Sequence, residues 1–238
     1  MEELTKMCIS SIERFFEKTN GKTAIVGISG GKDSAVVAAL CVKALGKENV
    51  IGVLMPNGEQ SDIEDAYKIC KFLDIKHFEL NIKPIFDNYF NSLMTSNIEP
   101  SQQAKINVLP RIRMTMLYFV AQSFKGGRVM NTSNASEKLV GYGTLWGDIV
   151  GDFSPLGNLY VSEVCAIGDD LCLPAELVHK IPSDGLTGKS DEESLGVTYN
   201  DIEMWGKHEK LPYETWHKIF QMHDKNKFKG ELVNLPTF

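Results

Sequence analysis

Residues 27–34 read Gly-Ile-Ser-Gly-Gly-Lys-Asp-Ser, and they follow directly on the apolar run Thr-Ala-Ile-Val at 23–26. A second apolar stretch, Ala-Val-Val-Ala-Ala-Leu-Cys-Val at 35–42, comes immediately after them. This pattern predicts a buried strand, a glycine turn and the start of a helix, because glycine adopts backbone angles that other residues avoid. The free N–H groups of a first helical turn attract anions. The stretch therefore predicts a phosphate site at the end of a strand.

The spacing of this stretch excludes the two most familiar nucleotide motifs. A kinase-type P-loop needs a glycine, four residues and then Gly-Lys-Ser/Thr, but here Asp33 follows Lys32 and Val26 stands at the first glycine's place. The dinucleotide fingerprint Gly-x-Gly-x-x-Gly is also absent. The pattern Ser-Gly-Gly-x-Asp-Ser instead resembles the pyrophosphate loop of the ATP pyrophosphatases, which cleave ATP into AMP and pyrophosphate.

This resemblance implies roles for the loop residues. Ser29, Ser34 and the backbone amides of residues 30–34 would hold the β- and γ-phosphates. Asp33 would bind Mg²⁺, since hard cations prefer carboxylate oxygen. Lys32 fills the variable position, so we assign it no catalytic role. The simpler interpretation is a glycine turn with a Ser/Asp helix cap. The expected ATP-binding residues of the loop are Gly27, Ile28, Ser29, Gly30, Gly31, Lys32, Asp33 and Ser34.

The composition favours a globular protein that works on small molecules. The chain has 238 residues, of which 43% are hydrophobic and 24% charged, enough for one large domain or two small ones. A formal net charge of −6 implies no broad nucleic-acid surface. No stretch approaches the roughly 20 apolar residues of a membrane helix, and the N-terminus is unlike a signal peptide. We therefore expect a cytoplasmic protein that binds neither nucleic acid nor membrane.

Strand and helix patterns alternate along the chain, which predicts an α/β fold. The apolar run 50–55 is typical of a parallel strand that is buried on both faces. Right-handed crossovers would give one parallel sheet covered by helices, with ligands at the carboxyl ends of its strands. Two polar stretches, 93–106 and 183–200, are expected to be loops, the first of them a mobile lid. Strands are expected at 23–28, 50–55, 76–80 and 127–132, and helices at 2–18, 33–45, from Ser61, 108–124, from Ser133, 161–173 and 174–180.

Segments beyond the loop carry a more specific pattern. They are Arg-Ile-Arg-Met (111–114), Asn-Thr-Ser-Asn-Ala-Ser-Glu (131–137), Gly-Tyr-Gly-Thr-Leu-Trp-Gly-Asp (141–148), Pro-Leu-Gly-Asn-Leu-Tyr (155–160), Ile-Pro-Ser-Asp-Gly-Leu (181–186), Ser-Asp-Glu-Glu-Ser-Leu-Gly (190–196) and Asp-Lys-Asn-Lys-Phe-Lys-Gly (224–230). In order and spacing they resemble the NAD synthetases over nearly the whole chain, specifically the short, ammonia-dependent branch. The resemblance implies a three-layer, Rossmann-like fold of the adenine nucleotide alpha-hydrolase type, with a parallel sheet between helices. It implies a single domain over 1–238, without the glutaminase domain of the long branch.

The implied reaction is the amidation of deamido-NAD to NAD by ammonia. ATP as co-substrate would adenylate the nicotinate carboxylate, and AMP and pyrophosphate would be released, with Mg²⁺ as cofactor. The resemblance also implies a homodimer with the deamido-NAD site at the subunit interface. The helices at 2–18 and 114–124 are candidate dimer surfaces, unless they simply pack on the sheet.

Site residues follow from the resemblance one position at a time. Each has a simpler interpretation: a helix-dipole carboxylate for Glu137, a turn or cap for Thr132 and Ser183, and a solvated charge for Arg111 and Lys225. The implied roles are catalysis and metal binding for Asp33 and Glu137, ATP contact for Thr132 and Ser183, and deamido-NAD contact for Arg111, Asp152 and Lys225.

Three positions depart from the family pattern. Val161 stands where many members carry a phosphate-binding lysine, and Leu145 replaces a lysine of the deamido-NAD pocket. Asp224 takes the place of a histidine, although His223 is adjacent. Lys189 in the second polar stretch is our candidate to replace the lysine missing at 161.

Two other functions stay open at this point. The chain could be another ATP pyrophosphatase that adenylates a different acceptor, although it has no basic extension for RNA and no suitably placed cysteine pair. It could also be a degenerate nucleotide-binding protein without ligase activity. Val161 and Leu145 favour the second alternative, and retention of the predicted metal and ATP residues argues against it.

Overall fold

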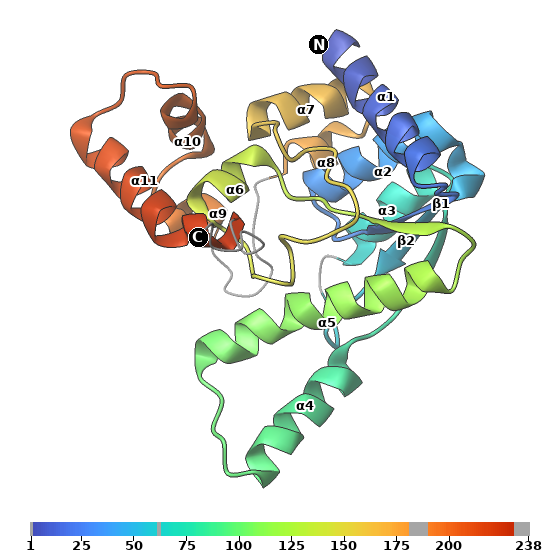
Figure 1. Cartoon of the computed structure of the whole chain (residues 1–238), viewed down its shortest axis with the longest axis horizontal. Coiled ribbons are helices and arrows are strands. Elements are labelled where there is room, and N and C mark those ends of the chain that lie inside the picture. Colours follow the sequence, from blue (N-terminus) through green and yellow to red (C-terminus); the bar gives the residue numbers. More distant parts are fainter. Residues whose placement is uncertain (1, 61–62, 181–189, 231–238) are drawn as a thin grey trace, which may run out of the picture.

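The structure is a computed structural model that describes residues 2–60, 63–180 and 190–230 (Figure 1). The strands are β1 (Thr23–Gly27), β2 (Val50–Leu54), β3 (Lys76–Glu79) and β4 (Gly127–Met130). The helices are α1 (Glu2–Lys18), α2 (Lys32–Leu45), α3 (Ile63–Phe72), α4 (Lys83–Thr95), α5 (Gln102–Gln122), α6 (Ala135–Val140), α7 (Val161–Asp170), α8 (Ala175–Val178), α9 (Asp191–Leu195), α10 (Tyr199–Gly206) and α11 (Tyr213–Asn226). Short 3₁₀ helices span Lys47–Asn49 and Lys227–Gly230.

The four described strands form one parallel sheet in the order β3-β2-β1-β4. In the register, Ile25 of β1 lies opposite Ile51 of β2 and Val129 of β4. All five residues of β2 are buried, as its continuous apolar run predicts for a strand covered on both faces. The four strand predictions are therefore confirmed to within one or two residues at their ends.

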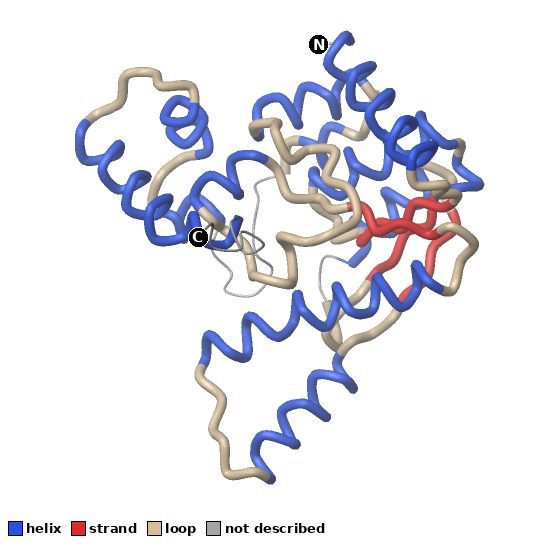
Figure 2. The backbone as a smooth tube through the Cα atoms, in the orientation of Figure 1, coloured by secondary structure: helices blue, strands red, loops and turns tan. Residues whose placement is uncertain are grey.

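Helices cover both faces of the sheet (Figures 1 and 2). Successive strand residues point to opposite faces, so Ala24 and Val26 belong to one apolar cluster and Ile25 to another. The first cluster includes side chains of α1, α2, α3, α7 and α8, and the second includes side chains of α4 and α5. The predicted three-layer fold with helices on both faces is confirmed.

Helix α1 packs against the sheet-covering layer through one apolar side. Its buried residues Cys8, Ile12 and Phe16 recur every four positions, the spacing of one helical face. This face contacts α2 and α7, and Met7 on the outer side is 62% exposed. Packing within the chain therefore uses the apolar face of α1.

A third apolar cluster joins α6, α9, α10 and α11, and α10 and α11 lie away from the sheet (Figure 1). The described part of the stretch 183–200 was predicted as a loop, and this prediction is wrong. Ser190 caps α9 by accepting the N–H of Glu193 at 3.1 Å, and α10 begins at Tyr199 after its cap Thr198. The sequence did not predict these short helices because their first turns are polar, and the residue types that cap helices are also common in loops.

The predicted lid loop at 93–106 is also wrong in length. Helix α4 continues to Thr95 and α5 starts at Gln102, where Ser101 accepts the N–H of Ala104 at 3.2 Å. Only residues 96–101 connect the two helices. Among the described helices, none combines the length and apolar character needed to span a membrane.

Candidate active site

The phosphate loop joins β1 to α2 at the carboxyl end of the sheet. The N–H of Ile28 donates to a backbone carbonyl of β2 at 2.9 Å, which fixes the start of the loop. Gly30 has a φ of 86°, a left-handed angle that favours glycine. The hydroxyl of Ser34 donates to the carbonyl of Gly31 at 3.0 Å, and the Oγ of Ser29 accepts the N–H of Gly31 at 3.2 Å. No side chain of the described residues caps α2 at Gly31, so the N–H groups of its first turn are suited to an anion.

A buried asparagine brings the two predicted metal carboxylates together. The Nδ2 of Asn134 donates to Oδ1 of Asp33 at 3.0 Å, across 101 residues of sequence. Asn134 also caps α6, because its Oδ1 accepts the N–H of Glu137 at 3.1 Å and Oε2 of Glu137 accepts the N–H of Asn134 at 3.3 Å. The predicted pair thus shares one site, at the N-termini of α2 and α6.

The pKa of the Glu137 carboxyl group differs from that of a solvated carboxylate at a helix N-terminus. Burial of the Glu137 carboxyl group raises its pKa well above the usual range, and the nearby Asp33 carboxylate raises that pKa further. The Lys32 ammonium and the Asn134 N–H act in the opposite direction. Two oxygen ligands that repel each other form a site that a divalent cation would stabilise. Within the described residues no group of three or more His, Cys, Asp or Glu side chains could hold a metal ion, so the pair would need further oxygens from substrate or water.

Lys32, which the sequence analysis includes among the ATP-binding loop residues without a catalytic role, contacts the Asp33 carboxylate. Its side chain is only 5% exposed, and its Nζ lies 3.0 Å from Oδ2 of Asp33. The same Nζ lies 5.5 Å from the centre of the Tyr199 ring. The hydroxyl of Tyr199 donates to the buried Asp191 at 3.0 Å. Sequence reasoning missed Tyr199 altogether, whereas Asp191 and Asn134 lie inside segments that carried the family resemblance.

The predicted ATP residue Thr132 lies in a segment that other side chains hold in place. Asn131 donates to the carbonyls of Asp148 and Val150 at 2.5 and 3.0 Å, and Ser133 donates to the carbonyl of Asp148 at 2.9 Å. Thr132 is the second residue after β4 and is half-buried between these two anchors. The other predicted ATP hydroxyl, Ser183, lies outside the described residues, as does Lys189.

Two arginines of α5 lie near the segment 141–148. Arg111 is exposed, and its Nε donates to the carbonyl of Leu145 at 3.0 Å. Arg113 donates to the carbonyl of Met55, at the carboxyl end of β2, at 3.0 Å. Burial lowers the pKa of Arg113, and the Asp148 carboxylate partly restores it. The structure therefore places the predicted Arg111 beside Leu145, the position of the missing lysine. Arg113 of the same motif is a further candidate site residue that the sequence did not single out.

Lys225 and Asp152 lie apart from the carboxylate pair. Lys225 is exposed near the end of α11. The pKa of the nearby Lys229 is lowered, mainly by burial and in part by the charge of Lys225. Lys229 donates to the carbonyls of Gly141 and Gly143 at 2.7 and 3.0 Å. Asp152 accepts the N–H of Val129 at 2.8 Å and the hydroxyl of Tyr118 at 3.3 Å. Asp152 thus holds a loop to β4, and a contact with deamido-NAD stays a prediction for both residues.

Val161, the first residue of α7, brings no charge to the site. Its backbone N–H donates to the Oγ of Ser136 at 3.3 Å, and its side chain packs on the third apolar cluster, which contains Tyr199. Asp224 forms a surface ion pair with Lys227 at 2.7 Å, and Nδ1 of His223 donates a hydrogen bond to the Leu139 carbonyl at 2.7 Å.

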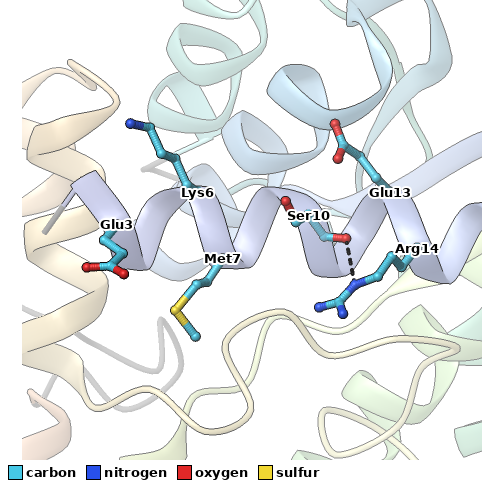
Figure 3. Close-up of a pocket in the computed structure, with 6 residues that line it drawn as sticks. All are labelled: Glu3, Lys6, Met7, Ser10, Glu13 and Arg14. Carbon is cyan, nitrogen blue, oxygen red and sulfur yellow. Dashed lines mark hydrogen bonds between the residues drawn. The ribbon is translucent and has the colours of Figure 1, made fainter.

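A separate depression lies on the outer side of α1 and is unrelated to the carboxylate pair. Figure 3 shows its lining, which comes from one helix only, with Arg14 donating to the backbone carbonyl of Ser10 at 3.3 Å. The lining residues are Glu3, Lys6, Met7, Ser10, Glu13 and Arg14. With no loop or strand end contributing, it lacks the features of a phosphate site.

Comparisons with known proteins show the family to which the chain belongs. The family model "NAD synthase" matches residues 4–233. A relative from Pyrococcus horikoshii, an NH(3)-dependent NAD(+) synthetase, is 38% identical, and the match covers 97% of this chain and 94% of the relative. The structure of an NMN synthetase from Francisella tularensis is 30% identical with a TM-score of 0.92, covering 100% and 98% of the two chains. An NH3-dependent NAD synthetase from Campylobacter jejuni, also 30% identical, has a TM-score of 0.79 and covers 100% and 97%. The chain therefore belongs to the NAD synthase family.

Proposed function

We propose that the protein is a C–N bond-forming ligase that amidates deamido-NAD to NAD with ammonia. An adenylated intermediate would form from ATP, and AMP and pyrophosphate would be released. The observation that carries this proposal is the meeting of the Ser29–Ser34 loop with the Asp33 and Glu137 carboxylates at one edge of the sheet. A phosphate loop alone fits many nucleotide proteins, and the adjacent carboxylate pair is what favours a metal–triphosphate substrate.

The carboxylate pair fits Mg²⁺ as the resident ion. Both groups offer hard oxygen ligands, and a divalent cation would stabilise the charged form of Glu137, whose pKa is raised mainly by burial and further by the Asp33 carboxylate. Asp33 and Glu137 would hold the ion, with Asn134 fixing both. When bound, Mg²⁺ would neutralise part of the triphosphate charge.

The residues of the chain contribute mainly binding and orientation. The loop N–H groups and the hydroxyls of Ser29 and Ser34 would hold the β- and γ-phosphates, so that the α-phosphorus faces the nicotinate carboxylate. Attack of that carboxylate oxygen on the α-phosphorus releases pyrophosphate and leaves an acyl adenylate. Ammonia then adds to the acyl carbon and AMP leaves. Arg111 and Lys225 would bind the phosphates of deamido-NAD as charge-assisted partners.

A second substrate is favoured by one specific observation. The Francisella structure titled NMN synthetase has a higher TM-score than the Campylobacter NAD synthetase at the same sequence identity. Leu145 also leaves the expected deamido-NAD pocket short of one cation. The same chemistry on the shorter nicotinate mononucleotide is therefore the second candidate function.

One assay tests both candidates. Purified protein is given ATP, Mg²⁺ and ammonium with either deamido-NAD or nicotinate mononucleotide, and AMP and the amidated product are quantified for each. We expect one AMP per amide formed, with deamido-NAD giving the higher kcat/KM. A higher kcat/KM with the mononucleotide would assign the second function. If neither acceptor leads to AMP release, both candidate functions are contradicted. Reactions without ammonium are the control for hydrolysis.

We also propose that residues 1–238 act as one domain and as a cytoplasmic homodimer. Large apolar side chains on α4 and α5 remain exposed, among them Tyr89 (50%), Met94 (46%) and Phe119 (70%), and in this proposal they form the apolar patch of the subunit interface. We expect light scattering to give twice the mass of the 26.5 kDa chain. A charge placed at the patch, Phe119→Glu, should shift the mass toward one chain, whereas Phe72→Glu, on another exposed surface, should not.

A further inference from the structure

A buried lysine lies in the first turn of α2, where the sequence pattern allows any residue. The side chain of Lys32 is 5% exposed, and its Nζ is 3.0 Å from the Asp33 carboxylate. Buried charges persist in proteins when they are paired. The position of this ammonium is therefore a built feature of the site and not the accidental placement of a surface lysine.

Three elements fix the ammonium in place. Asp33 belongs to α2 itself, Glu137 to α6, and the Tyr199 ring to α10. Tyr199 cannot swing away freely, because its hydroxyl donates to the buried Asp191 at 3.0 Å. Burial would lower the pKa of Lys32, but the carboxylates of Asp33 and Glu137 outweigh that effect and keep it above the usual range. Cys165 is the remaining ionisable group that influences this lysine.

The charge balance of the site explains why an internal cation is needed. Asp33, Glu137 and Asp191 are acidic groups that lie close enough to interact, because the Asp33 and Asp191 carboxylates add to the effect of burial in raising the pKa of Glu137. An ATP molecule adds further negative charge to the same place. Val161 supplies no charge from α7, and its side chain packs on the cluster that contains Tyr199. Lys32, in the first turn of α2, lies over the ring of Tyr199 and brings a positive charge there.

We propose that Lys32 is a substrate-positioning residue, whose ammonium holds Asp33 in the free protein and balances the triphosphate charge when metal and ATP are bound. The inference rests on the proposed function, because it assumes that the site binds a metal–ATP complex. It replaces Lys189, which lies outside the described residues, as the candidate for the missing lysine. Its physical consequence is distinctive: the ammonium competes with a metal for Asp33 but attracts ATP. Removing the charge should therefore change the two affinities in opposite directions.

The experiment compares Lys32→Met with a closely matched surface lysine. Lys207 also bonds one carboxylate, Glu203 at 2.6 Å, and also lies over one tyrosine ring, Tyr160 at 5.4 Å, but its side chain is 42% exposed. Mn²⁺ alone is titrated into each protein by paramagnetic resonance, and ATP with Mg²⁺ by calorimetry, both without acceptor. We expect Lys32→Met to bind Mn²⁺ about three- to tenfold more tightly and ATP at least about tenfold more weakly. Lys207→Met should change neither, and Lys32→Arg should recover most of the ATP affinity.

The possible outcomes separate this inference from the function on which it rests. A wild-type protein that binds neither Mn²⁺ nor ATP would contradict the proposed function itself. A wild-type protein that binds both, with Lys32→Met changing neither affinity or changing both in the same direction, would overturn the inference and leave the function intact. Thermal unfolding of each variant checks the fold. If Lys32→Met does not fold, Lys32→Gln provides the same comparison with a polar side chain.

Discussion

Replacing Asp33 with asparagine should lower kcat for AMP formation by about 10²- to 10³-fold, the usual cost of removing one electrostatic contact to a reacting group. The substitution keeps the shape of the side chain and its capacity to accept a hydrogen bond from Asn134, but it removes the negative charge that would hold Mg²⁺. It also leaves the Lys32 ammonium buried beside a neutral amide. The variant should therefore be less stable than wild type, since a buried charge without a partner is costly.

The measurement is single-turnover release of AMP at saturating ATP, with circular dichroism to confirm folding. Asp74→Asn is the matched control, because Asp74 pairs with Lys47 in an exposed ion pair far from the loop in sequence. That control should keep wild-type kcat, as exposed pairs contribute little. Wild-type turnover in Asp33→Asn would exclude Asp33 as a metal ligand. If excess Mg²⁺ fully restores the activity of Asp33→Asn, the carboxylate contributes to metal affinity alone.

Replacing Glu137 with glutamine should separate activity from stability. We expect kcat to fall by about 10²-fold, because the second metal carboxylate is lost. At neutral pH without Mg²⁺ we expect the free energy of unfolding to rise, because the variant no longer buries a charge next to Asp33. Glutamine can still accept the Asn134 N–H that completes the cap of α6.

The pH dependence of stability follows from the raised pKa of Glu137. In the window above its ordinary value of 4.5 and below its folded pKa, the folded protein keeps a proton that the unfolded chain has lost. Stability of the wild type should then fall as pH rises through this window, at about 1.4 kcal/mol per pH unit. The difference between the wild-type and Glu137→Gln denaturation curves isolates this contribution. Glu17→Gln, at an exposed position of α1, controls for the loss of one charge, and identical slopes in all three proteins would contradict the raised pKa.

The fold was largely predictable because short stretches of adjacent residues specify its central strands and the helix that follows the first of them. The two central strands, β1 and β2, are short apolar runs, and the glycine turn after 23–27 is followed at once by an apolar helix. Burial on both faces makes such runs continuous, which is a strong local signal. The first turns of α5, and the helices α9 and α10, were missed because these first turns are polar and capped by Ser101, Ser190 and Thr198. A cap stabilises a helix only once the following residues have an apolar surface to pack on, and the sequence does not show that surface.

The candidate site divides in the same way. Asp33 and Glu137 could be named from two motifs, since each motif carries its own pattern. The sequence could not reveal that Asn134 joins them, because that hydrogen bond crosses 101 residues. It also gave no reason to notice Tyr199 or Arg113, whose contacts lie on other elements.

The sequence by itself determined the phosphate loop, the parallel sheet and the family, because backbone angles, apolar runs and motif spacing are properties of adjacent residues. Only the tertiary structure decided the charge of the site. Lys32 fills the variable position of the motif, yet the packing around the start of α2 buries its ammonium next to the Asp33 carboxylate and the Tyr199 ring. Burial and electrostatic pairing depend on distances between remote segments, and those distances are set by how the layers pack.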